Sequence, residues 1–175
     1  MSEAAFQTQT LEYENLREEL FRTTGTEQYE SVLLRTQQHL SKKLTGDVSR
    51  MNEMELKEVI LNYITDYSVT CSLTDMPSVL TDHLYHDMAE LSFITRERLF
   101  ELPGFEELDV NGWDDVDIIV SGKRKKTEYS FINPKHAGDI LRRIMQRTSQ
   151  PFDDAMPCAV TDMGATMRIA ALKYP

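Results

Sequence analysis

The chain has 175 residues, of which 41% are hydrophobic and 27% are charged, and it contains seven glycines and six prolines. This composition indicates a folded globular protein with a hydrophobic core, and the presence of only two cysteines, Cys71 and Cys158, excludes a disulfide-rich scaffold and a zinc ribbon. No apolar run reaches the ~20 residues of a membrane helix, and the first residues lack the basic start of a signal peptide, so we expect a cytoplasmic protein.

The charges are distributed unevenly along the chain. The net charge of −10 argues against nucleic-acid binding. Residues 1–122 contain 24 acidic and nine basic residues, whereas residues 123–147 contain eight basic and two acidic ones. The basic stretch is suited to phosphates or to an acidic partner, or it is an ordinary solvated surface, and the sequence leaves both interpretations open.

The first half of the chain has the spacing of amphipathic helices. Apolar residues recur every three to five positions over 11–21 and again over 29–44. Another helix is expected to begin near Pro77, which is tolerated in a first turn, and to extend to about residue 91. Helices joined by short polar loops form bundles, so we predict a helical bundle over residues 1–92.

The clearest of these predicted helices follows Asn52. Asn52 and Glu55 have the spacing of a capping box, in which each side chain bonds the backbone of the other residue. The apolar stripe expected behind this cap comprises Leu56, Val59, Ile60, Tyr63, Ile64 and Tyr67. Leu56, Ile60 and Ile64 are therefore predicted to lie in the core of the bundle.

After about residue 93 the period changes to that of strands. Strands are predicted over 107–111, 116–120, 129–131, 157–160 and 166–172. Asn111-Gly112 and the basic segment 121–126 are predicted to be turns, and Asn133 and Pro134 are predicted to cap and open an amphipathic helix. We therefore predict an α+β fold, with the helical bundle followed over residues 93–175 by a small antiparallel sheet with a flanking helix (PAS-like).

No catalytic or metal-binding constellation emerges from the sequence. His83 and His86 have a spacing that could direct two imidazoles to a metal, but no further ligands complete a site, and an exposed polar helix face is the favoured interpretation. A Cys–His dyad would require a histidine to meet Cys71 or Cys158 in the fold, which nothing in the sequence demands. The acidic run 114–117 is interpreted as the entry to a strand rather than as paired acid and base carboxylates.

Gly122-Lys123 follows an apolar strand, as a phosphate-binding P-loop does. The motif requires a glycine where Asp117 stands and a serine or threonine where Arg124 stands. Without the glycine-rich cradle and the magnesium ligand, we do not expect this chain by itself to hydrolyse ATP or to hold a cofactor.

The order of the predicted elements is similar to that of a known family. The elements that carry the likeness are the strand that ends in Val110-Asn111-Gly112, the strand 116–120, the basic turn, the strand that starts at 129–131, the amphipathic helix and the segment Asp153 to Ile169. In this order they resemble the N-terminal domain of type II/type IV secretion ATPases, especially the branch that drives tight-adherence (Flp-type) pilus assembly. The resemblance covers roughly residues 90–175. The sequence departs from the family at two places. A compact Pro-Asp-Gly turn is usual in the last hairpin, where this chain has residues 162–167. The family also commonly has an arginine just before the Asp-rich segment, where this chain has Gln150-Pro151-Phe152.

The resemblance implies a role for this chain as the non-catalytic N-terminal region of a larger ATPase. The parent is expected to be a cytoplasmic homohexamer, peripheral to the inner face of the membrane, whose separate C-terminal core binds ATP and Mg²⁺. This core would begin after Pro175, so the chain is expected to be truncated at the interdomain linker. Its partners would be that core, the neighbouring subunits and an inner-membrane platform protein, and its role would be to cover the nucleotide cleft. Residues 1–92 resemble the variable N-terminal extensions of such ATPases.

A second interpretation comes from another class of protein. A five-stranded antiparallel sheet with a flanking helix also suits ligand-binding folds of the PAS type, so a stand-alone sensor or protein-interaction module stays open. A reading frame that continues beyond Pro175 into GxxxxGK[ST] would favour the ATPase, whereas a stop codon there would favour the module. A free-standing enzyme is the least expected class, because no constellation supports it.

The resemblance also names a candidate nucleotide contact, Arg168. A guanidinium can make bidentate contacts with phosphate that lysine cannot copy. The neighbours expected on the opposite face of this strand are Met167, Ile169 and Ala171. Further candidates on the preceding helix are Arg142, Arg143 and Arg147. The alternative is that Arg168 is an ordinary exposed arginine paired with Asp153 or Asp162.

Overall fold

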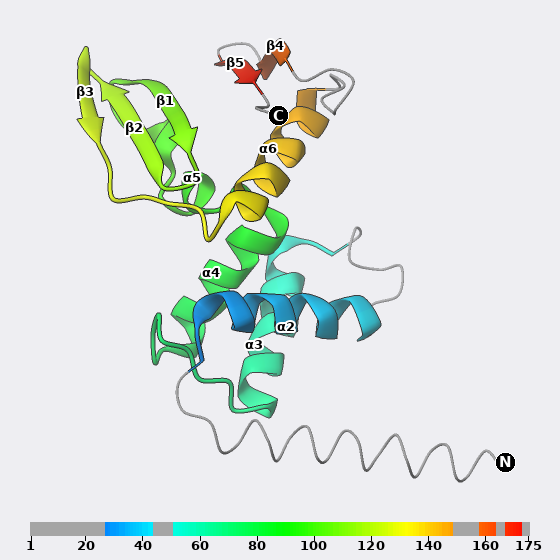
Figure 1. Cartoon of the computed structure of the whole chain (residues 1–175). Coiled ribbons are helices and arrows are strands. Elements are labelled where there is room, and N and C mark those ends of the chain that lie inside the picture. Colours follow the sequence, from blue (N-terminus) through cyan, green and yellow to red (C-terminus); the bar gives the residue numbers. More distant parts are fainter. Residues whose placement is uncertain (1–26, 44–50, 149–157, 164–166, 173–175) are drawn as a thin grey trace, which may run out of the picture. The chain divides into compact units, whose positions relative to one another are not determined.

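The structure is a computed structural model of the chain, and it describes residues 27–43, 51–148, 158–163 and 167–172 (Figure 1). The chain divides into two compact units, Met1–Thr81 and Asp82–Pro175, which we describe separately. Their boundary falls inside helix α4 (Pro77–Ala89), whereas the sequence predicts a domain boundary after residue 92. The helix predicted over 11–21 lies outside the described residues.

In the first unit, α2 (Tyr29–Lys43) and α3 (Glu53–Asp66) bury one apolar stripe each. The buried residues are Val32, Leu33, Thr36 and Leu40 of α2, and Leu56, Ile60, Tyr63 and Ile64 of α3. The predicted core positions of α3 are thus confirmed. Tyr67 was expected to continue the stripe but is 50% exposed, because α3 ends before it and Tyr67 forms the C-cap. The rings of His39 and Tyr63 lie 4.4 Å apart and bring α2 and α3 together.

The predicted capping box of α3 is confirmed. Asn52 Oδ1 accepts a hydrogen bond from the Glu55 amide at 3.0 Å, and Glu55 Oε2 accepts one from the Asn52 amide at 2.8 Å. Two of the amide groups that have no partner inside the helix are satisfied in this way. The cap therefore fixes where α3 begins.

Replacing Asn52 with alanine is expected to lower the free energy of unfolding by about 1 kcal/mol, because the Glu55 amide loses its acceptor. Urea denaturation followed by circular dichroism at 222 nm measures this change. Asn62→Ala is the matched control, since Asn62 lies exposed within the same helix and alanine is the better helix former there. Equal stability of the two variants would contradict an energetic role for the cap.

The second unit begins with the end of α4 and contains most of the remaining elements. Its further helices are α5 (Phe93–Arg96), the short 3₁₀ helix η2 (Leu99–Glu101) and α6 (Pro134–Thr148). Its strands are β1 (Phe105–Gly112), β2 (Asp115–Val120), β3 (Lys123–Lys126), β4 (Cys158–Met163) and β5 (Met167–Leu172). The α+β class, with helices first and small antiparallel sheets after them, is confirmed. In the described part of the chain, β1-β2-β3 and β4-β5 form two separate sheets rather than the single small sheet predicted over residues 93–175, on which the PAS-type alternative also rests.

The first sheet corrects two sequence predictions about its turns. Gly112 pairs with Asp115, so the β1–β2 turn consists of Trp113 and Asp114 and not of Asn111-Gly112. The β2–β3 turn is only Ser121-Gly122, whose φ angles of 51° and 72° are those of a tight hairpin turn. The chain therefore returns to the sheet at once, and most of the segment predicted as a basic turn is strand β3.

The third strand predicted from sequence, 129–131, is also wrong. No strand is formed there, and the Phe131 amide instead donates to the Trp113 carbonyl at 2.7 Å. The segment is apolar because its rings enter the core: Phe93 lies 5.2 Å from Tyr129 and 4.9 Å from Phe131, measured between ring centroids. Burial in the core, and not pairing in the sheet, explains the apolar pattern.

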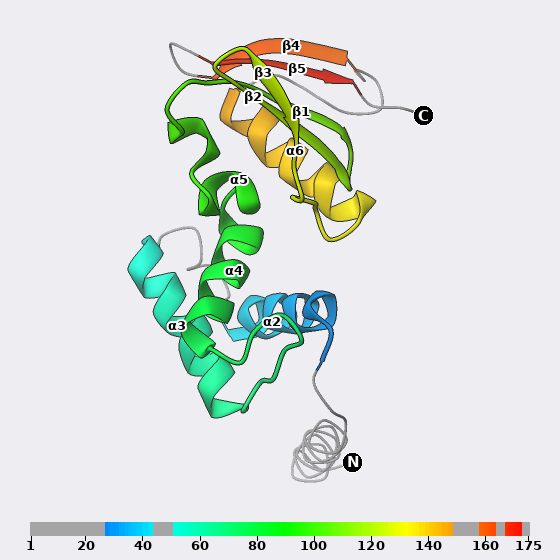
Figure 2. The ribbon, with the colours of Figure 1, turned by 90° about the vertical axis from the view of Figure 1, so that its left-hand side faces the viewer.

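The core of the second unit joins its helices to the first sheet. The buried cluster comprises Leu91, Phe93, Ile94, Leu99, Val116, Phe131 and Ile140. Figure 2 shows α6 running behind the β1-β2-β3 sheet, and Ile140 of α6 shares the cluster with Val116 of β2. The predicted start of α6 is confirmed, because Asn133 Oδ1 accepts a hydrogen bond from the His136 amide at 2.8 Å. Over the described ranges, no helix is long and apolar enough to cross a lipid bilayer.

Candidate functional site

Arg168 lies on β5, directly opposite Asp162 of β4. Its Nε is 3.2 Å from Asp162 Oδ1, and the arginine side chain is 77% exposed. Ile169 is half-buried and Ala171 is buried, which confirms the predicted alternation for these two residues; the side chain of Met167 and residue Asp153 lie outside what the structure describes. An exposed pair of this kind contributes about 0–1 kcal/mol, so the guanidinium can exchange its carboxylate for another anion at little cost.

Beyond the pair of Arg168 and Asp162, the exposed face of the β4-β5 hairpin is apolar over its described residues. Cys158, Val160, Ala170 and Leu172 are exposed on it in two cross-strand pairs. Val160 is 66% exposed and Leu172 is 65% exposed. A two-stranded sheet normally exposes polar residues on its solvent side, so this apolar face, with the Arg168–Asp162 ion pair at one end, has the composition of a contact surface.

The three α6 arginines have different partners. Arg142 donates to Asp139 Oδ1 at 2.6 Å on an exposed part of the helix. Arg143 donates to the carbonyl oxygens of Asp87 at 2.9 Å and Glu90 at 2.8 Å. Arg147 forms an ion pair of 2.8 Å with the Glu90 carboxylate.

These contacts divide the four sequence candidates into two groups. Arg143 and Arg147 meet at Glu90 and fasten α6 to the C-terminal end of α4. Arg142 and Arg168 are exposed, and each has a carboxylate from its own element or hairpin. Among the described residues, these contacts do not bring all four guanidinium groups to one point, and Arg168 is the most exposed of the four candidates.

Arg143 acts as a cap for α4. The last carbonyl groups of a helix have no partner inside it, and the guanidinium of Arg143 supplies donors to two carbonyls at this end. Burial lowers the pKa of Arg143 from its ordinary value, while Asp139 and Asp87 oppose the shift. An arginine retains its proton in such surroundings, so the cap remains charged.

His136, which is not among the site residues predicted from the sequence, lies next to this cap. It is 8% exposed, and its Nε2 is 3.9 Å from Oδ1 of Asp87, which is 3% exposed. Its Nδ1 is 3.3 Å from the Ile132 amide. The sequence does contain a signal for this position, because His136 stands three residues after the cap Asn133 and four before the buried Ile140.

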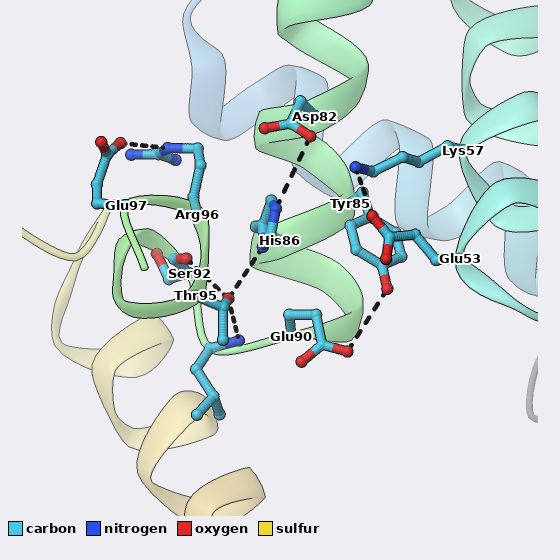
Figure 3. Close-up of polar contacts among 11 residues, drawn as sticks. Glu53, Lys57, Asp82, Tyr85, His86, Glu90, Ser92, Thr95, Arg96 and Glu97 are labelled. Atoms are coloured by element: carbon cyan, nitrogen blue, oxygen red, sulfur yellow. Dashed lines mark hydrogen bonds and ion pairs between the residues drawn. The ribbon is translucent and has the colours of Figure 1, made fainter. Parts of the chain in front are cut away.

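The other histidine pair makes contacts within the second unit. His86 Nδ1 is 2.9 Å from Thr95 Oγ1, and His86 Nε2 is 3.8 Å from Asp82 Oδ1 (Figure 3). Burial lowers the pKa of His83. Within residues 27–43, 51–148, 158–163 and 167–172, no three His, Cys, Asp or Glu side chains are arranged to hold a metal ion. His86 connects α4 to α5 through Thr95, whose hydroxyl also accepts from the Leu91 amide at 3.1 Å.

All four residues of the basic strand β3 are exposed, and two of them, Arg124 and Lys126, form ion pairs with acidic residues. Arg124 pairs with Asp109 and, at 3.2 Å, with Asp117, and Lys126 pairs with Asp115. These acidic residues lie on β1 and β2, so much of the basic charge seen in the sequence is balanced within the sheet. The interpretation of 123–126 as a solvated surface fits these ion pairs better than a phosphate site.

The described residues therefore offer two features of functional interest. One is the exposed β4-β5 face with Arg168, which is open to an anionic or apolar partner. The other is the group between α4 and α6 that consists of the buried His136 and Asp87 and the half-buried Arg143. A scan against protein-family models and a search of curated proteins return no match for this chain.

Proposed function

We propose that this chain is the non-catalytic N-terminal region of a hexameric secretion or pilus-assembly ATPase of the type II/type IV class. It would cover the nucleotide cleft of a C-terminal core that binds ATP and Mg²⁺, and it would couple hydrolysis to an inner-membrane platform protein. In this role it would work in the cytoplasm at the inner face of the membrane, in contact with neighbouring subunits. The parent protein, and not this region, would be the enzyme in protein transport.

The observation that carries the proposal is the exposed position of Arg168. The outgoing strand of the last hairpin, β5, presents its guanidinium at 77% exposure, where the resemblance expects a contact to nucleotide phosphates. A strand holds a side chain on a fixed face, and a guanidinium offers five N–H donors, of which Asp162 is contacted by Nε. The order β1, β2, α6, β4, β5 also supports the proposal, because the resemblance expects two strands, a helix and a final hairpin in this order. Strand β3, and the lack of a strand at 129–131, depart from the elements that were expected between β2 and the helix.

The first test of the proposal is the nucleotide sequence of the gene that encodes this chain. The reading frame beyond Pro175 is expected to encode GxxxxGK[ST] between a strand and a helix, the P-loop that holds the β and γ phosphates. A stop codon directly after Pro175 would contradict an ATPase core in the same chain. It would favour the alternative of a stand-alone PAS-like sensor or protein-interaction module, for which the exposed apolar pair Val160 and Leu172 is the supporting observation.

In the protein that carries the core, Arg168→Ala is expected to weaken nucleotide affinity or to lower ATP turnover by about tenfold or more, because charge-assisted hydrogen bonds contribute roughly 1.5–3 kcal/mol. Arg168→Lys should restore only part of this, because lysine lacks the bidentate geometry. Steady-state ATPase kinetics and binding of a fluorescent ATP analogue measure the two effects. In the present chain, the same change should alter stability by at most about 0.5 kcal/mol.

The matched control is Arg98→Ala. Arg98 is 72% exposed and pairs with Glu101, so it has the same exposure and the same kind of partner as Arg168. This variant is expected to keep wild-type nucleotide affinity and turnover. Equal kinetics in the Arg168 and Arg98 variants would remove Arg168 from the nucleotide site.

A further inference from the structure

His136 forms a reciprocal pair of hydrogen bonds at the start of α6 that is similar to a capping box, but its ring accepts from the amide of Ile132, the residue before the N-cap. Asn133 Oδ1 accepts from the His136 amide at 2.8 Å, and His136 Nδ1 lies 3.3 Å from the Ile132 amide in return. The reciprocal acceptor is usually the carboxylate of a glutamate or the amide of a glutamine. Here it is a ring nitrogen, which loses its lone pair when it binds a proton.

The hydrogen bond from the Ile132 amide defines which ring nitrogen of His136 carries the proton. An amide N–H can only donate, so Nδ1 must be the unprotonated nitrogen that accepts from Ile132. The single proton of the neutral ring is then on Nε2, which is buried and points toward Asp87 Oδ1 at 3.9 Å. This distance is too long for a hydrogen bond. The neutral Nε2–H form is therefore the one that the folded second unit holds.

The surroundings of His136 contain charges of both signs. Asp87 faces it from α4, and Asp139 and Arg143 face it from α6. The ring of Phe131, from the segment before the helix, lies 6.0 Å away in an edge-on arrangement. Phe131 belongs to the core cluster of the unit. The hydrogen bond between His136 and the Ile132 amide therefore fixes a segment whose preceding residue packs in the core.

We propose that His136 is a pH-sensitive latch of the second unit: protonation of Nδ1 releases the Ile132 amide and loosens residues 131–133 and the first turn of α6. The proton comes from water and occupies the lone pair that accepts from Ile132. Two N–H groups then face each other at this position, and the hydrogen bond is lost. The imidazolium regains solvation when the segment opens, so the open form binds the proton more tightly than the closed one.

The electrostatics of the site agree with this direction. Burial is the largest effect and lowers the pKa of His136 below its ordinary value of 6.5; Asp87 and Asp139 oppose the shift, and Arg143 adds to it. The closed form therefore binds fewer protons than the open form at pH values just below 6.5. Its stability is complete above pH 6.5 and is lost as the pH falls toward the lowered pKa.

The test uses the full chain labelled with ¹⁵N. Hydrogen exchange of the Ile132 amide is measured by NMR at pH 7.5 and pH 5.5 and is corrected for the intrinsic exchange rate, and the His136 ring nitrogens are titrated in the same samples. We expect the Nε2–H form at pH 7.5, a midpoint below 6.5 and a severalfold loss of Ile132 protection at pH 5.5. Two results would contradict the proposal. One is that the exchange protection of the Ile132 amide stays the same while His136 becomes protonated. The other is that Nδ1 carries a proton at pH 7.5.

Two variants separate His136 from other histidines. His136→Asn keeps an acceptor oxygen in the place of Nδ1 but does not titrate, so its Ile132 protection should be the same at both pH values. His39→Asn is the matched control, because burial also lowers the pKa of His39 but it lies in the first unit. It should retain the wild-type pH dependence at Ile132. If His136→Asn loses Ile132 protection at low pH to the same extent as the wild-type protein, the proposal is refuted. If that variant does not fold, the titration of the wild-type protein decides the question.

Discussion

Ile60→Ala is expected to destabilise the first unit by roughly 2–5 kcal/mol. Ile60 has no exposed surface, and its neighbours on the buried stripe of α3, Leu56 and Ile64, are 6% and 2% exposed. Truncation removes three carbon atoms from a packed core that cannot collapse fully into the cavity, so lost transfer free energy and lost contacts add together. The loss is a large fraction of the stability of a small unit.

Two optical probes assign this loss to the correct unit. Circular dichroism at 222 nm follows the helices, whereas fluorescence of Trp113, the single tryptophan of the chain, follows the second unit. Urea unfolding of Ile60→Ala should shift the circular dichroism transition far more than the fluorescence transition. Met54→Ala is the control on the same helix, because Met54 is 81% exposed and its loss should cost no more than about 0.5 kcal/mol. Equal effects of the two changes would mean that the buried face of α3 is misassigned.

The helices could be predicted because their signals are local. The capping box at Asn52, the proline at the start of α4 and the Asn133-Pro134 start of α6 each involve residues within one turn, and the structure confirms all three. Apolar spacing over several turns then defined the buried face of α3. The α+β class followed from the change of period after residue 93.

The errors fall where a residue's role depends on distant partners. Four consecutive basic residues favour a solvated turn, yet Lys123–Lys126 form a strand because Asp115 and Asp117 on β2 and Asp109 on β1 compensate Arg124 and Lys126. The segment 129–131 has the composition of a strand, but the rings of Tyr129 and Phe131 pack beside Phe93 in the core. Local composition cannot distinguish these outcomes, since burial against a distant element and pairing in a sheet require the same residue types.

The candidate arginines show the same limit. The sequence indicates a basic face on the helix 134–148 and cannot tell an exposed arginine from a buried one. The difference between Arg142 and Arg143 arises from Asp87 and Glu90, which lie more than 50 residues earlier in the chain. Only the fold separates the arginine that caps α4 from the neighbour that pairs with Asp139.

Arg143→Met should therefore destabilise the second unit by about 2 kcal/mol. Methionine keeps an unbranched apolar stem, so the change mainly removes the guanidinium that bonds the Asp87 and Glu90 carbonyls. Hydrogen bonds to a charged group contribute roughly 1.5–3 kcal/mol each, and partial access of water to this half-buried site reduces the sum of the two. Urea unfolding followed by Trp113 fluorescence measures the change in the relevant unit.

Arg142→Met is the matched control, one position earlier on the same helix. Arg142 is 62% exposed and pairs with Asp139 one turn away, a contact that contributes about 0.3–0.5 kcal/mol. Its replacement should leave the fluorescence midpoint nearly unchanged. If Arg142→Met and Arg143→Met shift the midpoint equally, the loss reflects helix charge and not the cap of α4. A large shift for Arg143→Met alone would show that the cap stabilises the second unit, because the two variants differ only in whether the guanidinium reaches the end of α4.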